Sequence, residues 1–329
     1  MNTILINSRQ YTAALPLPDE LSFATQKNYL FDLSYLISIV IDGESGSNFL
    51  QGQLSCDLQQ VTTNQMQPGA LCNLKGRVLA LMEVIYSQTQ GLSLVLPRDL
   101  ADDTMSSLAK AAQFSRVQLH PAHDLVMLGF LLNHTDDITP FKCPLPEEPF
   151  AVISYDDYLC YHLGNHRYVF ITTKGLAEKI IPLFQAQQQW RGSLAWHQLA
   201  LTQHYPEIYP NTRGLLLPHR IGLQKLGYLN FQKGCYKGQE IIARTHFKAK
   251  LKHEVALFRV TTSDVLQSGL KLYQPGSAIE IGELIDLCPL NTGDTLIMAS
   301  ILFDHPNEIQ IESMKQPVTL HPYTATHTG

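Results

Sequence analysis

The chain has 329 residues, of which 45% are apolar and 16% are charged, a composition typical of a globular protein and too apolar for a disordered one. Its net charge of −5 argues against a molecule built as a whole to attract nucleic acid or an anionic membrane. The length suggests two or three domains with a sizeable core.

The first sixty residues contain one clear strand pattern. The N-terminal stretch "MNTILINSRQ" lacks a basic segment followed by an apolar one, so we expect no secretory signal. The apolar run "YLISIVI" at 35–41 is too short to span a bilayer, and with the Asp-Gly that follows it predicts a strand and a turn. Apolar residues over 44–61 recur at helical spacing, although Gly52 weakens that helix.

The next seventy residues predict strands around one helix. Residues 69–97 read as three strands, separated by turns at Lys75-Gly76 and at Gly91. Residues 98–114 have one apolar face and aspartates in the first turns, which predicts a helix. The runs "RVQLH" and "LVMLGFLL" follow as strands.

The middle of the chain predicts a loop, a hairpin and two helices. The proline-rich stretch 139–150 is typical of a loop, and 158–172 of a hairpin about Gly164-Asn165. Helices are expected near 174–189 and over 193–203, the second with Ser193 as its N-cap.

From about residue 251 onward, short β-like runs alternate with Gly, Pro and Asn turns, which predicts a small β-barrel or sandwich. We place a domain boundary near 246–252. The expected organisation is therefore one region over 1–247, either a single unit or two interleaved subdomains, and a C-terminal β-barrel domain over 248–329.

The cysteines and histidines indicate neither a disulfide framework nor a metal centre. The cysteines are at positions 56, 72, 143, 160, 235 and 288, with no C-x-x-C spacing. A long chain without a signal favours free thiols in a reducing cytoplasm. The closest histidine pairs, "HPAH" at 120–123 and "HLGNH" at 162–166, have no thiol or carboxylate cluster beside them, so we expect no stably bound metal.

One cysteine has an unusual frame, "KGCYKGQE" at 233–240. Lys233 and Lys237 lie two residues either side of Cys235, and the residues after Gly238 can begin a short helix. Cations and a helix N-terminus both favour the reactive thiolate. From the spacing alone, a buried structural cysteine in a loop with solvated lysines is the plainer interpretation, and His219 and His246 are candidate partners only by nearness in sequence.

The octapeptide closely resembles the K-G-C-Y-x-G-Q-E signature of the YgfZ family, folate-binding proteins of iron–sulfur cluster maintenance related to the glycine-cleavage T-protein. The segments "FLQGQLSCDL", "CNLKGRVLA" and "LPHRIGLQKLGYLNFQKGCYKGQEIIAR" are also similar to blocks of that family. The resemblance covers roughly residues 33–260. It implies an α+β fold, with a T-protein-like folate-binding body of antiparallel sheets and helices followed by a small C-terminal β-barrel.

The resemblance also implies which residues act. Cys235 matches the functional cysteine, Trp196 matches a tryptophan placed against folate, and Tyr236 is assigned to folate binding with it. An indole can stack on the face of a pterin, although a core aromatic on an amphipathic helix is the plainer interpretation of Trp196. The remaining motif positions are Lys233, Gly234, Gly238, Gln239, Glu240 and Arg244.

Two departures from the family pattern put parts of the site in doubt. Where relatives often carry an aromatic residue at the start of the strand that ends in Gly43, this chain has Leu36, with Tyr35 beside it. The basic run after the motif has Ala249 in place of a glycine. Its lysines, at 248, 250 and 252, either meet the glutamate tail of a folate or form a solvated strand edge.

Three functions compete. The resemblance implies a tetrahydrofolate-binding factor that supports assembly or repair of iron–sulfur clusters, with client enzymes or assembly proteins as partners in the cytoplasm. The alternative is a folate-dependent aminomethyltransferase, but Leu79 and Ala80 occupy the positions of the T-protein's acidic pair, and Glu83 is expected to lie too far along the strand. A tRNA-binding protein is disfavoured by the net charge and by the lack of aromatic-basic patches. We therefore expect no direct nucleic-acid partner and no membrane partner.

Overall fold

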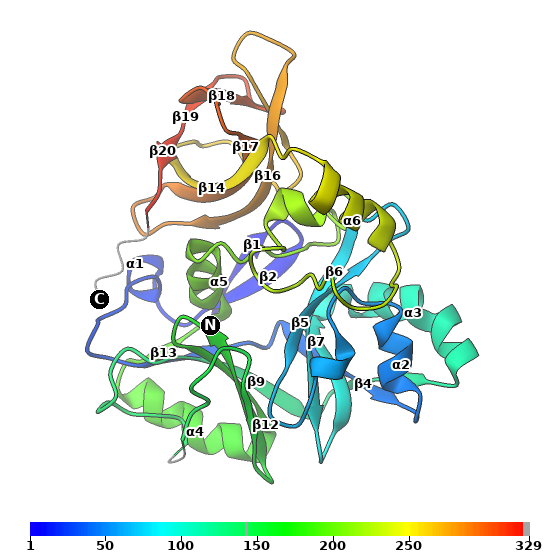
Figure 1. Ribbon diagram of the computed structural model, residues 1–329. Helices are drawn as coiled ribbons and strands as arrows, with labels where there is room; N and C mark the ends of the chain where they lie inside the picture. The colour runs from blue at the N-terminus through cyan, green and yellow to red at the C-terminus, as the bar shows by residue number, and fades with distance from the viewer. Residues whose placement is uncertain (142–143, 325–329) are drawn as a thin grey trace.

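A computed structural model describes residues 1–141 and 144–324. Its strands form three large, mostly antiparallel sheets and one two-stranded hairpin, with few helices between them (Figure 1). The sequence therefore predicted an α+β fold correctly. Cys143, together with residue 142 of the predicted loop, lies outside the described residues.

A five-stranded sheet carries most of the first half of the chain. Its hydrogen-bonded order is β5, β6, β7, β4, β8. The strands are β4 (Leu36–Asp42), β5 (Gln67–Cys72), β6 (Val78–Ser87), β7 (Gly91–Pro97) and β8 (Gln118–Ala122). These strands confirm the ones predicted over 35–43 and 69–97. Their apolar residues pack into one core with those of α3 (Ala101–Ser115).

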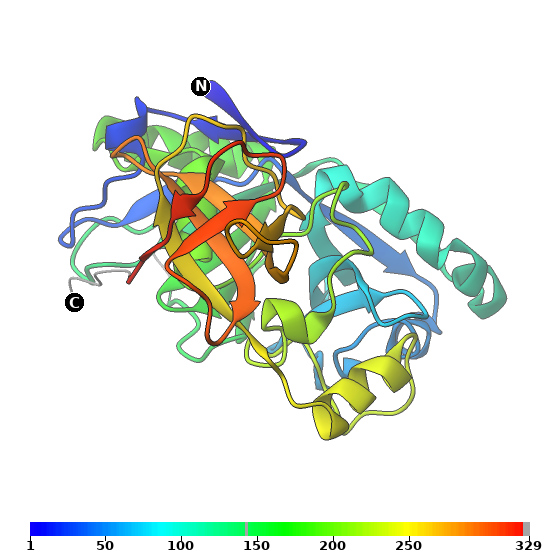
Figure 2. The same ribbon diagram turned by 90° about the horizontal axis from the view of Figure 1, so that it is seen from above.

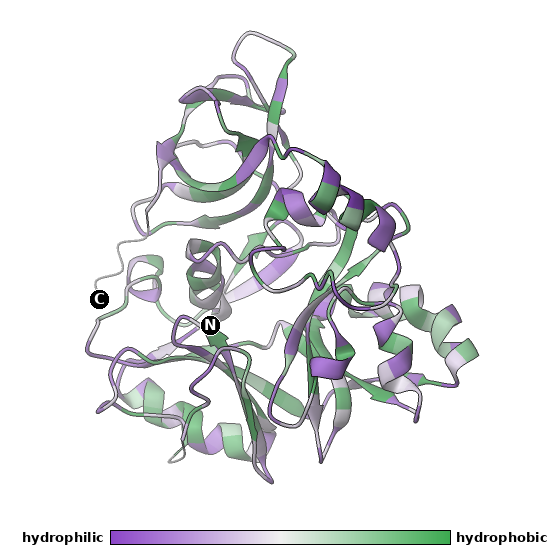
Figure 3. Ribbon diagram, in the orientation of Figure 1, coloured by the Kyte–Doolittle hydropathy of each residue, from purple (hydrophilic) through white to green (hydrophobic). Residues whose placement is uncertain are grey.

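A six-stranded sheet lies beside it, in the order β10, β11, β12, β9, β3, β13. The predicted hairpin about Gly164 joins two of its strands, as expected. The strands are β3 (Tyr29–Asp32), β9 (Leu125–Leu131), β10 (Val152–Ser154), β11 (Tyr158–Gly164), β12 (Arg167–Thr173) and β13 (Trp190–Arg191). In Figure 3 these strands are apolar along much of their length, as expected for a sheet covered by α4 (Lys174–Ala186) on one face and α5 (Ser193–Thr202) on the other.

A seven-stranded sheet from the last part of the chain curls into a nearly closed barrel, drawn from yellow to red in Figures 1 and 2. The order is β19, β18, β15, β16, β17, β14, β20. The strands are β14 (His253–Val260), β15 (Lys271–Tyr273), β16 (Glu280–Pro289), β17 (Thr295–Leu302), β18 (Glu308–Ile311), β19 (Val318–Thr319) and β20 (His321–Pro322). The sequence left a barrel and a sandwich open for this region, and the structure agrees with the barrel.

The N-terminal hairpin, β1 (Asn2–Ile6) and β2 (Arg9–Ala13), was not predicted from the sequence. Its second strand contacts α5, which in turn contacts β16 of the barrel. The hairpin therefore lies where the body and the barrel meet, and the short helix α1 (Leu17–Glu20) continues from it.

The remaining helical segments are short. The helix expected over 44–61 is confined to α2 (Gly46–Gln51) and the 3₁₀ turn η1 (Leu58–Gln60); η2 (Arg98–Leu100) and η3 (Pro218–Ile221) are similar turns. α6 (Gln239–Lys248) follows the cysteine motif as expected. No helix in residues 1–141 and 144–324 is long and apolar enough to cross a bilayer.

Candidate functional site

A small cavity lies at the centre of the body, between the five-stranded sheet, the six-stranded sheet and α5. Its volume is about 80 Å³, below the roughly 300–1,000 Å³ usual for ligand pockets, so a ligand as large as a pterin enters only if lining side chains move. It is lined by Tyr35, Leu36, Pro68, Leu81, Glu83, Pro97, Phe150, Tyr161, Leu163, Arg167, Val169, Trp196, Ala200, Tyr205, Pro206, Glu207 and Tyr228. Aromatic walls with few charged groups are typical of a site for a flat polar ring.

Trp196 forms one wall of this cavity. The side chain projects from α5 onto β9, where a Cβ added to Gly129 would come within 2.7 Å of the indole. The ring also contacts Phe31 at a centroid distance of 5.3 Å. The sequence therefore selected a residue that does line the cavity, and a glycine in the strand beneath it makes room for the ring.

Arg167, which the sequence analysis did not single out, is the cation that lines the cavity. It is buried at the start of β12, and its guanidinium lies 4.7 Å from the ring centroid of Tyr205 and 5.6 Å from that of Trp196. Nε and Nη2 have no hydrogen-bond partner in the described part of the chain. Burial lowers the pKa of this arginine, because a cation without full pairing is less stable in the interior than in water.

Glu83 also lines the cavity, which corrects the expectation that it lies too far along its strand. Successive side chains of β6 alternate between the two faces, so Glu83 shares a face with Leu81, another lining residue. Burial, reinforced by the charge of Glu207, raises the pKa of Glu83 to about 8. Tyr161 in β11 adds a hydroxyl that has no partner in the described residues.

The wall that was in doubt is built by Tyr35 and Leu36, which both line the cavity. Leu79 lies on the same strand as Glu83 and is buried, as is Ala80. Neither lines the cavity, so the loss of acids at those two positions leaves Glu83 as the carboxylate that β6 supplies.

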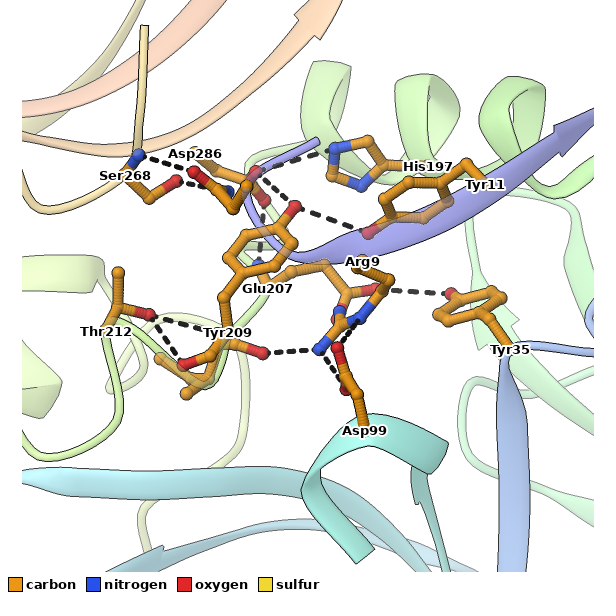
Figure 4. Close-up of polar contacts among 12 residues, drawn as sticks. Arg9, Tyr11, Tyr35, Asp99, His197, Glu207, Tyr209, Thr212, Ser268 and Asp286 are labelled. Atoms are coloured by element: carbon orange, nitrogen blue, oxygen red, sulfur yellow. Dashed lines mark hydrogen bonds and ion pairs between the residues drawn. The ribbon is translucent and has the colours of Figure 1, made fainter. Parts of the chain in front are cut away.

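Glu207 connects the cavity to a buried polar network (Figure 4). Its carboxylate accepts a hydrogen bond from Arg9 Nη1 at 2.7 Å and from the Tyr35 hydroxyl at 3.2 Å. Arg9 also donates to both carboxylate oxygens of Asp99, at 3.0 and 2.8 Å. Burial raises the pKa of Glu207, and the positive charge of Arg9 opposes that rise. Arg9 therefore stabilises the ionised form of Glu207, which burial alone would disfavour.

The same network continues to Asp286 in β16 of the barrel. The Glu207 backbone N–H donates to Asp286 at 2.9 Å, and the Tyr209 hydroxyl donates to it at 2.7 Å. His197 in α5 lies 3.5 Å from the same carboxylate; burial opposes the charge of the imidazole, but Asp286 outweighs it and raises the pKa of His197. The network thus joins the body to the barrel beside the cavity.

The cysteine motif lies apart from the cavity, on a loop that is pinned on both sides of an exposed thiol. Lys233 Nζ donates to the carbonyls of Gln51, Leu54 and Cys56, each at 2.7 Å. The Lys237 backbone N–H donates to the Gly52 carbonyl at 3.1 Å. Cys235 itself is exposed, which contradicts the plainer interpretation of a buried structural cysteine.

Lys233 does not flank the thiol as the spacing suggested. Its side chain is buried, and its ammonium is bound to the carbonyls of residues 51–56. Burial lowers the pKa of Lys233 to about 8. This lysine therefore anchors the loop.

The other motif residues shape the loop and the helix after it. The Tyr236 side chain is buried under the loop, with Lys233 Nζ 5.0 Å from its ring centroid, and it does not line the cavity. Gly238 is the N-cap of α6 with φ +82°, and a Cβ there would collide with the carbonyl oxygen of Asn73. Gln239 Oε1 accepts from the Tyr236 backbone N–H at 3.4 Å. Gly234, Glu240 and Arg244 are exposed.

The two histidines suggested as partners of Cys235 lie against one another instead. The rings of His219 and His246 are 5.7 Å apart, and that of His246 stacks on Phe231 at 3.8 Å. Burial, with a contribution from His246, lowers the pKa of His219 to about 4. In residues 1–141 and 144–324, no hydrogen bond joins either histidine to Cys235, and no three His, Cys, Asp or Glu side chains form a metal-binding group.

The segment that follows Cys235 in the chain combines basic and apolar side chains. We call residues 237–252 together with the β5–β6 turn the α6 surface. Residues 237–252 carry five basic residues against one acidic, in a chain of net charge −5. Phe247 is 69% exposed, and Leu74 in the adjoining turn is 78% exposed. The turn packs against α6, since a Cβ at Gly76 would lie 3.1 Å from Ile241.

Comparison with known proteins bears on this arrangement. No family profile matches the chain. It is 28% identical over 262 residues to the tRNA-modifying protein YgfZ of Klebsiella pneumoniae (strain 342), covering 78% of this chain and 80% of that protein. It is 30% identical over 215 residues to that of Hamiltonella defensa, covering 64% and 63%, and 27% identical over 262 residues to that of Colwellia psychrerythraea, covering 77% and 75%.

These matches confirm that the chain resembles the YgfZ family along most of its length. The fold agrees with this resemblance. The aminomethyltransferase T of the glycine cleavage system from Bartonella henselae superimposes with a TM-score of 0.74 over 98% of this chain and 93% of that one, at 15% identity. That likeness establishes a T-protein-like fold for this chain and, at such low identity, nothing about its activity.

Proposed function

We propose that the protein binds reduced folate in the central cavity and supports the assembly or repair of iron–sulfur clusters in client enzymes, with Cys235 as the acting thiol. The observation that carries folate binding is the cavity itself. It combines the indole of Trp196 with Arg167 and Tyr161, whose buried polar atoms have no partner in the described residues. Buried polar groups without partners are rare in proteins, and a polar ring seated among them would satisfy them.

The donor set fits a pterin better than an apolar ligand. Trp196, Tyr205 and Tyr228 offer π-faces, while Glu83 and Arg167 offer an acceptor and donors of opposite charge. The narrow volume requires lining side chains to move on binding. Tetrahydrofolate, when bound, supplies one-carbon carrying capacity; these residues hold and orient it.

A thiol function at Cys235 is supported by its position. It is exposed on a loop whose backbone is held through Lys233 and Lys237, so the thiol is presented at a fixed place on the surface. One thiolate cannot hold a cluster, which usually takes four ligands. The thiol therefore acts together with ligands from a partner protein.

The partner that we propose for the α6 surface is an iron–sulfur client or assembly protein with an acidic face. The local excess of basic residues matches such a face, and the exposed Phe247 and Leu74 supply apolar contact. The relatives are named tRNA-modifying proteins. We propose that an effect on tRNA arises through an iron–sulfur client enzyme.

Titration of tetrahydrofolate against the pure protein tests the folate part. Quenching of tryptophan fluorescence is expected, and it should be lost in Trp196→Ala, because the other tryptophan, Trp190, does not line the cavity. Absence of binding by calorimetry at millimolar ligand would refute folate binding.

A complementation assay tests the thiol. Cys235→Ser should leave folding and folate binding intact, since replacing sulfur by oxygen changes little volume at an exposed site, but should abolish support of iron–sulfur enzymes in a strain lacking the native protein. Full support by the serine variant would exclude a chemical role. Salt-sensitive binding of purified tRNA that is lost in Lys248→Glu/Lys250→Glu would instead point to tRNA as the occupant of the α6 surface.

A second candidate, aminomethyl transfer, is kept open by Glu83, a carboxylate in the cavity on the strand where the acid was expected to be missing. We expect no such activity, because Leu79 and Ala80 leave the acidic pair unfilled. Steady turnover with aminomethylated carrier protein and tetrahydrofolate would establish the transferase instead.

A further inference from the structure

The polar groups of the central cavity are few, and several of them have no hydrogen-bond partner within the described part of the protein. The guanidinium of Arg167 lies near the rings of both Tyr205 and Trp196. Its Nε and Nη2 have no partner in the described residues, and neither does the Tyr161 hydroxyl. Among residues 1–141 and 144–324, no side chain of another residue donates a hydrogen bond to Glu83.

These groups favour a ligand that carries a hydrogen-bond acceptor and hydrogen-bond donors on one edge. Arg167 needs an acceptor, and a carboxylate at Glu83 needs donors. The pyrimidine ring of a pterin carries both on one edge, an oxo group beside a ring N–H and an amino group. A simple anion would satisfy Arg167 but not Glu83, and an apolar ligand would satisfy neither, so each would leave a polar group without a partner at a cost.

We propose that Glu83 and Arg167 together recognise the pyrimidine edge of the folate, and that Glu83 gives up a proton to solvent when the ligand binds. The oxo group accepts from Arg167, while the ring N–H and amino groups donate to the Glu83 carboxylate. This inference rests on the proposed folate binding and adds to it the residues that select the pterin and a linkage between binding and pH.

The surroundings of Glu83 explain why it holds a proton in the free protein. The groups that face it are Glu207 after α5, Arg167 from β12, Tyr161 from β11, Tyr228 from the loop after η3, and Tyr35 before β4. Burial and the charge of Glu207 favour the neutral acid, and they outweigh the opposing effects of a hydrogen bond to its own backbone and of the Arg167 charge, so the pKa of Glu83 lies at about 8. Two hydrogen-bond donors on the ligand would stabilise the ionised carboxylate of Glu83 and so lower its pKa.

The linkage has a definite sign. Below a pH of about 8 the free protein must lose a proton from Glu83 to bind, so affinity should rise about tenfold per pH unit over roughly pH 6 to 7.5 and level off above about pH 8.5. Near neutral pH, about one proton should be released for each ligand bound.

Isothermal calorimetry with 5-formyltetrahydrofolate, an air-stable reduced folate, in two buffers of different ionisation enthalpy measures that proton directly in the unmodified chain. Glu83→Gln should abolish the proton release and the pH dependence, and should weaken binding tenfold or more at pH 8.5. Arg167→Lys should weaken binding at every pH while leaving the proton count unchanged, because the charge stays but the planar fork is lost. p-Aminobenzoylglutamate, which lacks the pterin, should show no proton release.

The outcomes separate the two proposals. If the unmodified chain does not bind the reduced folate, folate binding itself fails. If it binds with no proton release, or if Glu83→Gln binds with the same affinity and the same pH profile, folate binding stands and the recognition by Glu83 is wrong. The calorimetric proton count needs no variant, so the test holds even if a substitution disturbs folding.

Discussion

The indole of Trp196 lies directly on the backbone of Gly129, so closely that a single added carbon at the glycine would stand 2.7 Å from the ring. This contact fixes the position of the cavity wall from below. A side chain on the strand at that point would push the tryptophan toward the cavity, which is already narrow.

Gly129→Ala is therefore expected to weaken folate binding by displacing Trp196, with a cost to stability of about 1–3 kcal/mol for the overpacked core. Fluorescence quenching by tetrahydrofolate and a denaturant melt measure the two effects. Gly175→Ala is the control, because a Cβ at that helical position meets nothing within 4 Å. Unchanged quenching in Gly129→Ala would mean that the wall tolerates the shift.

Cys235 should react first with limiting iodoacetamide near neutral pH. Of the cysteines in the described residues it is the exposed one. Cys56 and Cys72 are buried, and burial raises the pKa of both thiols to about 12. Peptide mass mapping reads the order of labelling, with Cys143, which lies outside the described residues, followed in the same experiment. Earlier labelling of Cys56 or Cys72 would show that the body opens readily.

Lys233→Met should destabilise the protein by about 2–4 kcal/mol, because three carbonyls of the segment 51–56 lose their common donor in a buried place. Lys237→Met is the matched control. Lys237 holds the loop through its backbone N–H, which the substitution keeps, so a change within about 0.5 kcal/mol is expected. Equal losses in the two variants would show that Lys233 does not anchor the loop.

The segment 44–61 shows why periodicity predicted the strands well and this helix badly. Its apolar residues do recur at helical spacing, but the carbonyls of Gln51, Leu54 and Cys56 bind Lys233. A partner 177–182 residues away in the chain thus replaces helical hydrogen bonds. The strands over 69–97 needed no such partner, because neighbouring strands satisfy one another.

The site residues show the same division. The choice of Trp196 and Cys235 followed from the resemblance, whereas Arg167 and Glu83 did not. Both lie in strands that the sequence predicted, but which face of each strand borders the cavity depends on how two sheets pack together. The Ser193 N-cap was wrong for a similar reason: Gly192 caps α5, and Ser193 Oγ accepts from the Thr12 backbone N–H of the hairpin at 2.8 Å.

Glu83→Gln should also change how stability depends on pH. Between its ordinary pKa of 4.5 and about 8, Glu83 holds a proton in the folded chain but not in the unfolded one. The contribution of this bound proton to the free energy of unfolding is therefore complete below pH 4.5 and is lost as the pH rises toward 8. From pH 5 to 8.5 the free energy of unfolding of the unmodified chain should fall relative to that of the variant, on the order of 3 kcal/mol.

Denaturant melts of both chains at the two pH values measure this difference. Other titrating groups cancel between the two chains, and the exposed Glu44→Gln should show no such trend. A constant difference between the unmodified chain and Glu83→Gln would mean that Glu83 is ionised in the folded chain.

Arg9→Met should cost about 3–5 kcal/mol, because Glu207 would be left as a buried charge without its cation. Lys174→Met is the control: its pair with Glu178 is 4.0 Å long and exposed, so the expected change is below about 0.5 kcal/mol. Adding Glu207→Gln to Arg9→Met should restore part of the loss. A double variant no more stable than Arg9→Met would show that Glu207 is not the group left stranded.

The buried network also constrains the order in which the newly made chain can fold on the ribosome. Arg9 leaves the ribosome early, but Glu207 is 198 residues behind it, which is about 10–40 s of synthesis at roughly 5–20 residues per second. Asp286, which positions Glu207 from the barrel, comes later still. The N-terminal hairpin must therefore wait, undocked, until most of the chain has been translated, and its docking is among the last steps of biogenesis.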